Sequence, residues 1–230
     1  MNPSAYARFT STLLGNLSVR SDVLGLVALG STSGEGAPPD QWSDHDFFVV
    51  TAPGAQEAFR ADLSWLPDAD RIALSFRETA HGLKVVYRGG HLVELAVFDA
   101  EELFLARVNR WRVLLDRADV EARMRQVRER TAAETARRDD DVWRAGQLLG
   151  GLLVGTGRFR RGERASGQRL VWCNALEHLL VLVARHVLAE RPEARDDLDA
   201  FRRLESAYPA LAREIERARG LDLPEAAAAL

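Results

Sequence analysis

Short runs of β-branched and aromatic residues in the first half of the chain constrain its fold most strongly. Runs of this kind, bounded by glycine, proline and polar residues, predict strands. We expect strands at residues 23–29, 46–51, 71–76, 83–87, 92–98 and 111–115, and helices at residues 6–17 and 56–66. Gly89-Gly90, between the fourth and fifth runs, favours a tight hairpin turn. This half therefore predicts a sheet flanked by helices.

Beyond residue 118 the periodicity becomes helical. Residues 118–150 and 196–218 are amphipathic, the latter with an interruption near Pro209, and residues 170–188 are apolar on more than one side, which indicates a central helix. We therefore predict an α+β fold. A mixed β-sheet domain flanked by helices covers residues 1–118, and a helical bundle domain covers residues 119–230.

The composition excludes several classes of protein. Hydrophobic residues make up 47% and charged residues 28% of the 230 residues, and the formal net charge is -3, so a folded chain is expected and nucleic acid is an unfavoured partner. No apolar run reaches the roughly 18 residues of a membrane span, so no membrane partner is expected. The single cysteine, Cys173, permits no intrachain disulfide, and the first residues lack a signal-peptide pattern. We expect a cytoplasmic monomer or homodimer. Lys84 is the only lysine, which we attribute to a general preference for arginine.

Acidic residues occupy two of the predicted strands. Asp44 and Asp46 open the second strand, and Glu94 interrupts the apolar fifth strand. Alternate residues of a strand lie on one side, about 6.5–7 Å apart, so both aspartates share a face while His45 points to the other. A divalent cation removes the repulsion between such carboxylates, and Mg²⁺ prefers carboxylates together with waters and phosphate oxygens.

Glu94 and the Gly30-Ser31 dipeptide extend this pattern. An ionised carboxylate in an apolar strand is costly unless it is paired or bound to a metal. If its strand lies beside that of Asp44 and Asp46, three carboxylates converge and can hold two metal ions about 3.5–4 Å apart. Glycine lets the backbone approach phosphate closely, and Ser31 adds a hydroxyl group, so we expect both residues to bind nucleotide phosphates. These groups suit in-line attack at phosphorus.

Taken in order, Gly30-Ser31, Ser43-Asp44-His45-Asp46 and Glu94 resemble the signature of the DNA polymerase β-type nucleotidyltransferase superfamily, over about residues 23–98. In that superfamily a Gly-Ser turn precedes an Asp-x-Asp pair, and a later strand supplies a third acid, whose position Glu94 matches. The helical half resembles that of antibiotic nucleotidyltransferases in architecture only. The chain departs from its relatives in having no basic residue within positions 32–36 and a glutamate as third acid.

The resemblance implies a Mg²⁺-dependent nucleotidyltransferase. It would move a nucleoside monophosphate, with ATP as the first donor to consider among the NTPs, onto a hydroxyl group of a small molecule such as an aminoglycoside or lincosamide, and so confer antibiotic resistance. Asp44 and Asp46 would bind the ion that holds the triphosphate, and Asp46 and Glu94 the ion that activates the acceptor. The domain at residues 119–230 would form the acceptor-binding side of the cleft. Three alternatives stay open: a toxin–antitoxin enzyme that modifies a protein or tRNA, a non-catalytic nucleotide-binding regulator, and a protein-interaction module.

Two glutamates of the helical half are candidates for the general base. Glu177 flanks the core stripe of the central helix, where a half-buried carboxylate would take the proton of the acceptor hydroxyl. Glu163 is the second candidate, and for both residues a solvated surface role is the alternative that glutamate most often takes. Trp42, beside the acids, would stack on a base or sugar or merely pack.

Overall fold

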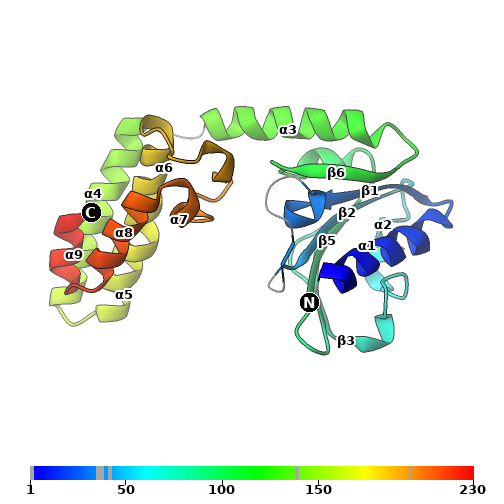
Figure 1. Ribbon diagram of the computed structural model, residues 1–230, viewed down its shortest axis with the longest axis horizontal. Coiled ribbons are helices and arrows are strands. Elements are labelled where there is room, and N and C mark those ends of the chain that lie inside the picture. Colours follow the sequence, from blue (N-terminus) through cyan, green and yellow to red (C-terminus); the bar gives the residue numbers. More distant parts are fainter. Residues whose placement is uncertain (1–2, 35–38, 41–42, 138–139, 197) are drawn as a thin grey trace. The chain divides into compact units, whose positions relative to one another are not determined.

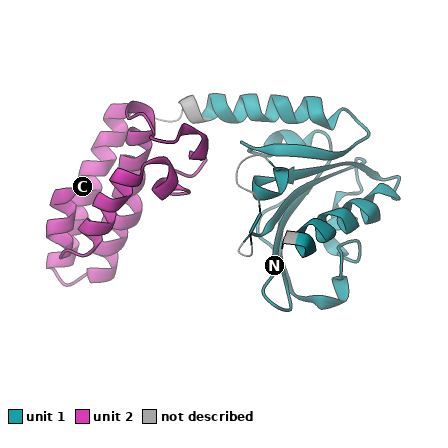
Figure 2. Cartoon of the chain, viewed as in Figure 1, with its two compact units in different colours: residues 1–134 teal, residues 135–230 magenta. Residues whose placement is uncertain are grey.

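A computed structural model describes residues 3–34, 39–40, 43–137, 140–196 and 198–230. The chain divides into two compact units, residues 1–134 and residues 135–230, which Figure 2 colours separately. The first unit is a mixed sheet with helices, and the second is helical (Figure 1). This arrangement confirms the predicted α+β class at the level of secondary structure.

A six-stranded mixed sheet forms the centre of the first unit, in the order β3-β4-β5-β2-β1-β6. Its strands are β1 (Val23–Leu29), β2 (His45–Thr51), β3 (Ile72–Arg77), β4 (Gly82–Tyr87), β5 (Leu92–Phe98) and β6 (Trp111–Asp116). The pair β2 and β5 is parallel, and every other neighbouring pair is antiparallel. The six predicted strands are confirmed to within one residue at each end.

The hairpin predicted at Gly89-Gly90 joins β4 to β5. Both glycines have positive φ angles, +102° and +84°, which suit residues without a Cβ. The amide of Tyr87 donates to the carbonyl oxygen of His91 at 2.8 Å and closes the turn. The turn fixes the register in which Lys84 of β4 lies opposite Glu94 of β5.

Helices cover both faces of the sheet. On one face, α1 (Pro3–Ser18) and α2 (Gln56–Ala61) pack Phe9, Leu13 and Phe59 against buried Phe47 and Val49 of β2. On the other face, α3 (Val120–Arg137) packs a second core against the sheet, together with the 3₁₀ helix η3 (Glu102–Leu105). These two faces are called the α1 face and the α3 face below.

The position of α3 moves the predicted boundary between the units. We expected the sheet domain to end at residue 118, because the helical period begins there. Val120, Met124 and Val127 are, however, completely buried in the core of the α3 face. The compact unit therefore extends to Glu134, because this first long helix belongs to the sheet.

The second unit contains the remaining helices, and its core gathers around Leu176, Leu180 and Ile215. The helices are α4 (Asp141–Arg160), α5 (Arg164–Arg169), α6 (Leu176–His186), α7 (Leu204–Ala207), α8 (Pro209–Arg219) and α9 (Leu223–Ala229). The helix expected at residues 118–150 is two helices, because the Asp140 side chain accepts a hydrogen bond from the Trp143 amide at 2.6 Å and starts α4 anew. The central helix begins with a π-helical turn, Leu170–Ala175. No helix within the described ranges has the length and apolarity to cross a membrane.

Candidate functional site

The parallel strands β2 and β5 bring Asp46 and Glu94 to facing positions. Their register pairs Asp46 with Glu94 directly, and neighbouring strands lie about 4.7–4.9 Å apart. Because Phe47 and its partner Leu95 are buried on the α1 face, the two acids point to the α3 face. The requirement set by the sequence, that the strand of Glu94 lies beside that of the aspartates, is met.

The Gly30-Ser31 turn lies beside Asp46. It is a short 3₁₀ helix, η1 (Gly30–Ser33), that directly follows β1. Gly30 has a φ of +51°, and a Cβ at this position would lie 2.9 Å from Oδ2 of Asp46. The left-handed backbone favours glycine here, and a Cβ would make the Asp46 carboxylate shift. The backbone of the turn therefore comes close to the carboxylate that faces Glu94.

Tyr6 of α1 connects this turn to the segment before β2. Its hydroxyl group donates to the carbonyl oxygen of Asp44 at 2.7 Å and lies 2.5 Å from Oγ1 of Thr32 and 3.4 Å from Oγ of Ser31. Burial raises the pKa of Tyr6, although the hydrogen bonds with Ser31 and Thr32 oppose this shift. The phenol therefore stays protonated and holds two parts of the site together. The sequence alone predicts only that Tyr6 lies at the start of the helix expected at residues 6–17.

Asp44 lies one residue before β2, outside the ladder that pairs Asp46 with Glu94. It lines a hollow of about 500 Å³ together with Ser43, His91 and the Gly89-Gly90 turn. Among the residues that the structure describes, no three His, Cys, Asp or Glu side chains form a group ready to hold a metal ion. The structure thus pairs Asp46 with Glu94. Asp44 lies two residues before Asp46 in the chain and is not part of this pair.

His45 points to the α1 face, as the strand period predicts. Its ring stacks on Tyr6 with the centroids 3.6 Å apart, and Nδ1 lies 2.8 Å from Nε2 of His91. Burial and the neighbouring His91 lower the pKa of His45 to about 3. The His45 imidazole is therefore neutral. It lies between Asp44 and Asp46 in the sequence and supports the start of β2 from the α1 face.

Glu94 has a partner that the sequence interpretation overlooked. Nζ of Lys84 lies 3.0 Å from Oε1 of Glu94 and 3.0 Å from Oε1 of Glu78. These contacts, with Glu78 first and Glu94 second, raise the pKa of Lys84 to about 12. The two-residue turn expected at Gly89-Gly90 would have paired Lys84 with Leu95. In the structure the turn has three residues, so Lys84 pairs with Glu94 instead.

The side chains at this site are of the chemical type that binds divalent cations. Mg²⁺ takes carboxylate oxygens, waters and substrate phosphate oxygens, and Asp46 and Glu94 offer carboxylates from facing positions. The missing side chain at Gly30 keeps the space beside Asp46 free of a Cβ. One carboxylate oxygen of Glu94, Oε1, is already in contact with Lys84.

Arg112 of β6 lies beside the turn that follows β1. Its Nη2 lies 3.5 Å from the carbonyl oxygen of Thr32, and a Cβ at Gly34 would lie 3.8 Å from Cζ of Arg112. Arg112 pairs with Ala28, which is buried in the core of the α1 face. This guanidinium group therefore supports the turn from the face opposite Asp46. Glu35, Gly36 and Trp42 lie outside the described residues.

The two glutamates proposed as general base are both on the surface of the helical unit. Glu177 is exposed, because Leu176 and Leu180 occupy the buried side of α6, so its expected half-buried position is wrong. The Glu163 side chain is 51% exposed and lies 3.4 Å from Arg161.

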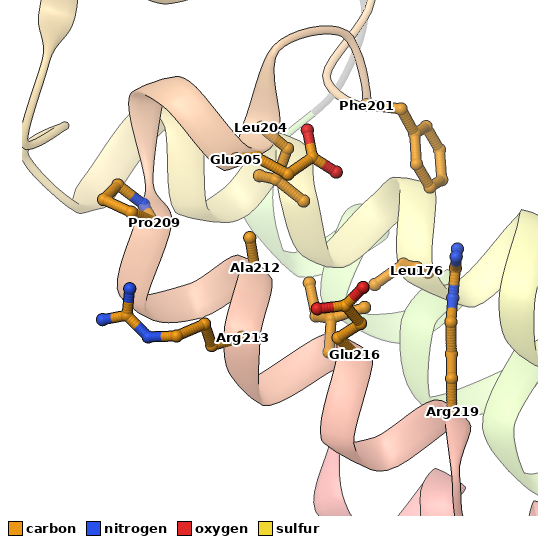
Figure 3. A pocket seen from close by; sticks show the side chains of 10 residues that line it. Leu176, Phe201, Leu204, Glu205, Pro209, Ala212, Arg213, Glu216 and Arg219 are labelled. Carbon is orange, nitrogen blue, oxygen red and sulfur yellow. The ribbon is translucent and has the colours of Figure 1, made fainter.

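The helical unit has a hollow of its own, of about 340 Å³, between α6, α7 and α8. Figure 3 shows the carboxylates of Glu205 and Glu216 at this hollow, near Phe201 and Leu176. Its lining includes neither Glu177 nor Glu163. Among the described residues of the helical unit, neither glutamate therefore lies at the hollow where a ligand would fit.

No family model matches this chain, and no curated protein matches it in sequence. Any functional conclusion thus depends on the geometry of the sheet unit.

Proposed function

We propose that this chain is a Mg²⁺-dependent nucleotidyltransferase. It transfers a nucleoside monophosphate from an NTP to a hydroxyl group of a small molecule and releases pyrophosphate, and ATP is the first donor to test. The observation that supports it most is the register of Asp46 against Glu94 on adjacent parallel strands, with the Gly30 turn against Asp46. The order of the Gly-Ser turn, the Asp-x-Asp pair and the later acid along the chain supports it independently.

Asp46 and Glu94, joined by Asp44, would hold the divalent cation. When bound, such an ion neutralises charge on the phosphates and polarises the attacking hydroxyl group. Asp46 is common to both proposed ion positions, which agrees with its place between the turn at Gly30 and the facing Glu94.

The other residues position the donor. The Gly30-Ser31 turn would offer its backbone and the Ser31 hydroxyl group to the β- and γ-phosphates, since position 30 has no side chain in the way. Tyr6 keeps this turn and Asp44 in fixed relation through its hydroxyl group. Such fixed positioning of reactants lowers the entropic cost of reaction.

The charge of the site favours a cationic acceptor. Asp46 and Glu94 face one another on the sheet, Glu78 shares Lys84 with Glu94, and Lys84 neutralises only part of their charge. A cleft with excess negative charge concentrates positively charged ligands. We therefore propose antibiotics of the aminoglycoside class, which carry several amino groups, as the first acceptors to test, with lincosamides as the second.

Mass spectrometry tests this proposal most broadly. The full chain is incubated with Mg²⁺, each NTP in turn and a panel of hydroxylated antibiotics. A nucleoside-monophosphate mass increment on one compound, lost in Asp46→Asn and Glu94→Gln but kept in the exposed control Glu129→Gln of α3, supports the proposal.

Two other results would direct attention to the alternatives. Binding of Mg²⁺-ATP without pyrophosphate release across the panel would favour a nucleotide-binding regulator. An increment found only on a protein or tRNA would keep the chemistry and replace the acceptor.

A further inference from the structure

We propose that Lys84 is a built-in counter-ion that competes with the divalent cation for Glu94, and that Glu78 accepts the ammonium group when the cation binds. This inference rests on the proposed function, because it assigns a positioning role to Lys84 at the same metal site. It concerns how strongly the site binds its ion and not which acceptor is used.

The contacts of Lys84 carry the inference. Its Nζ lies at the same distance, 3.0 Å, from one carboxylate oxygen of Glu94 and one of Glu78. The register of β4 with β5 pairs Lys84 with Glu94, and the register of β5 with β2 pairs Glu94 with Asp46. The side chains of Asp46, Glu94 and Lys84 therefore lie in one row across β2, β5 and β4, two negative and one positive. The ammonium group already occupies one side of the carboxylate that the ion would need.

Electrostatics explains why such a group is needed. Without a cation, Asp46 and Glu94 would be like charges on facing positions, which is destabilising. Lys84 offsets this repulsion while the metal is absent. When a divalent ion binds between the acids it supplies the same compensation, and the ammonium group then repels it.

The second carboxylate provides the place to which Lys84 can move. Glu78 follows β3 and its side chain is 48% exposed, whereas the side chains of Lys84 and Glu94 are 27% and 37% exposed. Because the contact with Glu78 already exists, rotations within the flexible lysine side chain are enough to release Glu94. The backbone of the β4–β5 hairpin need not change.

A lysine at position 84 suits a contact with Glu94 that must break when the ion binds. Lys84 is the only lysine in a chain with 31 lysine and arginine residues. An arginine at this position could grip a carboxylate with two parallel hydrogen bonds, whereas an ammonium group is a compact charge on a flexible stem. The position that pairs with Glu94 thus has the cation that holds a carboxylate less rigidly.

Binding of Mn²⁺ alone, followed by electron paramagnetic resonance of the free ion, tests the inference on the full chain. Lys84→Gln should bind Mn²⁺ about five- to tenfold more tightly than the wild type, and Lys84→Arg more weakly, because a unit charge close to a divalent ion is removed or held in place. Glu78→Gln should weaken binding, and this loss should fall below about twofold in the Lys84→Gln background. Arg77→Gln is the matched control, since Arg77 pairs with Glu57 instead and its loss changes the net charge equally; its affinity should stay within about twofold.

The outcomes separate this inference from the proposed function. Unchanged or weaker Mn²⁺ binding by Lys84→Gln, in a variant whose circular dichroism matches the wild type, overturns the inference while the metal site stands. If neither the wild type nor Lys84→Gln binds Mn²⁺, both proposals fall. If only Lys84→Gln binds it, the competition is stronger than expected and the inference holds.

Discussion

Acidification from pH 7 to pH 5 should destabilise the sheet unit through His45. The His45 residue is completely buried, its ring is stacked on Tyr6, and its two ring nitrogens contact His91 and the carbonyl oxygen of Tyr6. Burial first, and His91 second, lower the pKa of His45 to about 3 in the folded chain, against an ordinary value of 6.5. The unfolded chain therefore takes up a proton as the pH falls below 6.5, while the folded chain does not.

The sign and size of the effect follow from this difference. A depressed folded-state pKa contributes stability that is fully present above the unfolded-state value and is lost as the pH falls through 6.5 toward 3. Between pH 7 and pH 5 the loss is about 2 kcal/mol, since each unit below the unfolded-state pKa costs about 1.4 kcal/mol. His45 of the folded chain is still neutral at pH 5, so this part of the loss depends on the unfolded-state pKa alone.

Urea unfolding at pH 7 and pH 5, at constant ionic strength, measures this loss. The control is His45→Gln, whose amide can still donate to the carbonyl oxygen of Tyr6 but does not titrate. The variant should be less stable than the wild type at pH 7 and should lose about 2 kcal/mol less on acidification. Equal losses in the two proteins would refute the assignment of His45 as a buried neutral imidazole.

Four further substitutions test the site. Asp46→Asn and Glu94→Gln should each lower nucleotidyl transfer about 100-fold or more, with little change in the melting temperature, because they remove proposed metal ligands; loss of folding instead of activity would contradict this. Gly30→Ala should cost about 1–2 kcal/mol in urea unfolding and also reduce nucleotide binding, because its φ is +51° and the new Cβ would lie 2.9 Å from Asp46; a variant with wild-type stability would speak against the strained turn. Tyr6→Phe should cost about 1–2 kcal/mol by leaving the carbonyl oxygen of Asp44 without its donor, and an unchanged urea midpoint would show that this hydrogen bond matters little.

The strands could be predicted because their pattern is local. Runs such as Leu92–Phe98 alternate between buried and less buried residues, and glycine or proline ends many of them. The two-residue hydrophobic period and the residues that end each run therefore predict the same strands. The helical half was harder. The side chain of Asp140 divides one predicted helix into two, and α3 belongs to the sheet only because Val120 and Met124 find a core there. Neither fact is visible in helical periodicity.

The candidate site shows the same division between local and non-local information. The types and spacing of Gly30, Asp46 and Glu94 suggested the chemistry, and the strand order then placed the two acids face to face. The partners of these residues come from elsewhere in the fold. Tyr6 reaches the turn only after α1 has packed on the sheet, and Lys84 meets Glu94 only through the hairpin register.

The position of a bound manganese ion tests the central claim most directly. A crystal of the full chain with Mn²⁺ and a non-hydrolysable ATP analogue, measured at the manganese absorption edge, would locate the ion by its anomalous signal. We expect a peak within bonding distance of carboxylate oxygens of both Asp46 and Glu94, with the analogue's phosphates beside the Gly30-Ser31 turn. A nucleotide bound elsewhere, or a manganese peak that touches neither acid while Glu94 keeps its contact with Lys84, would contradict it.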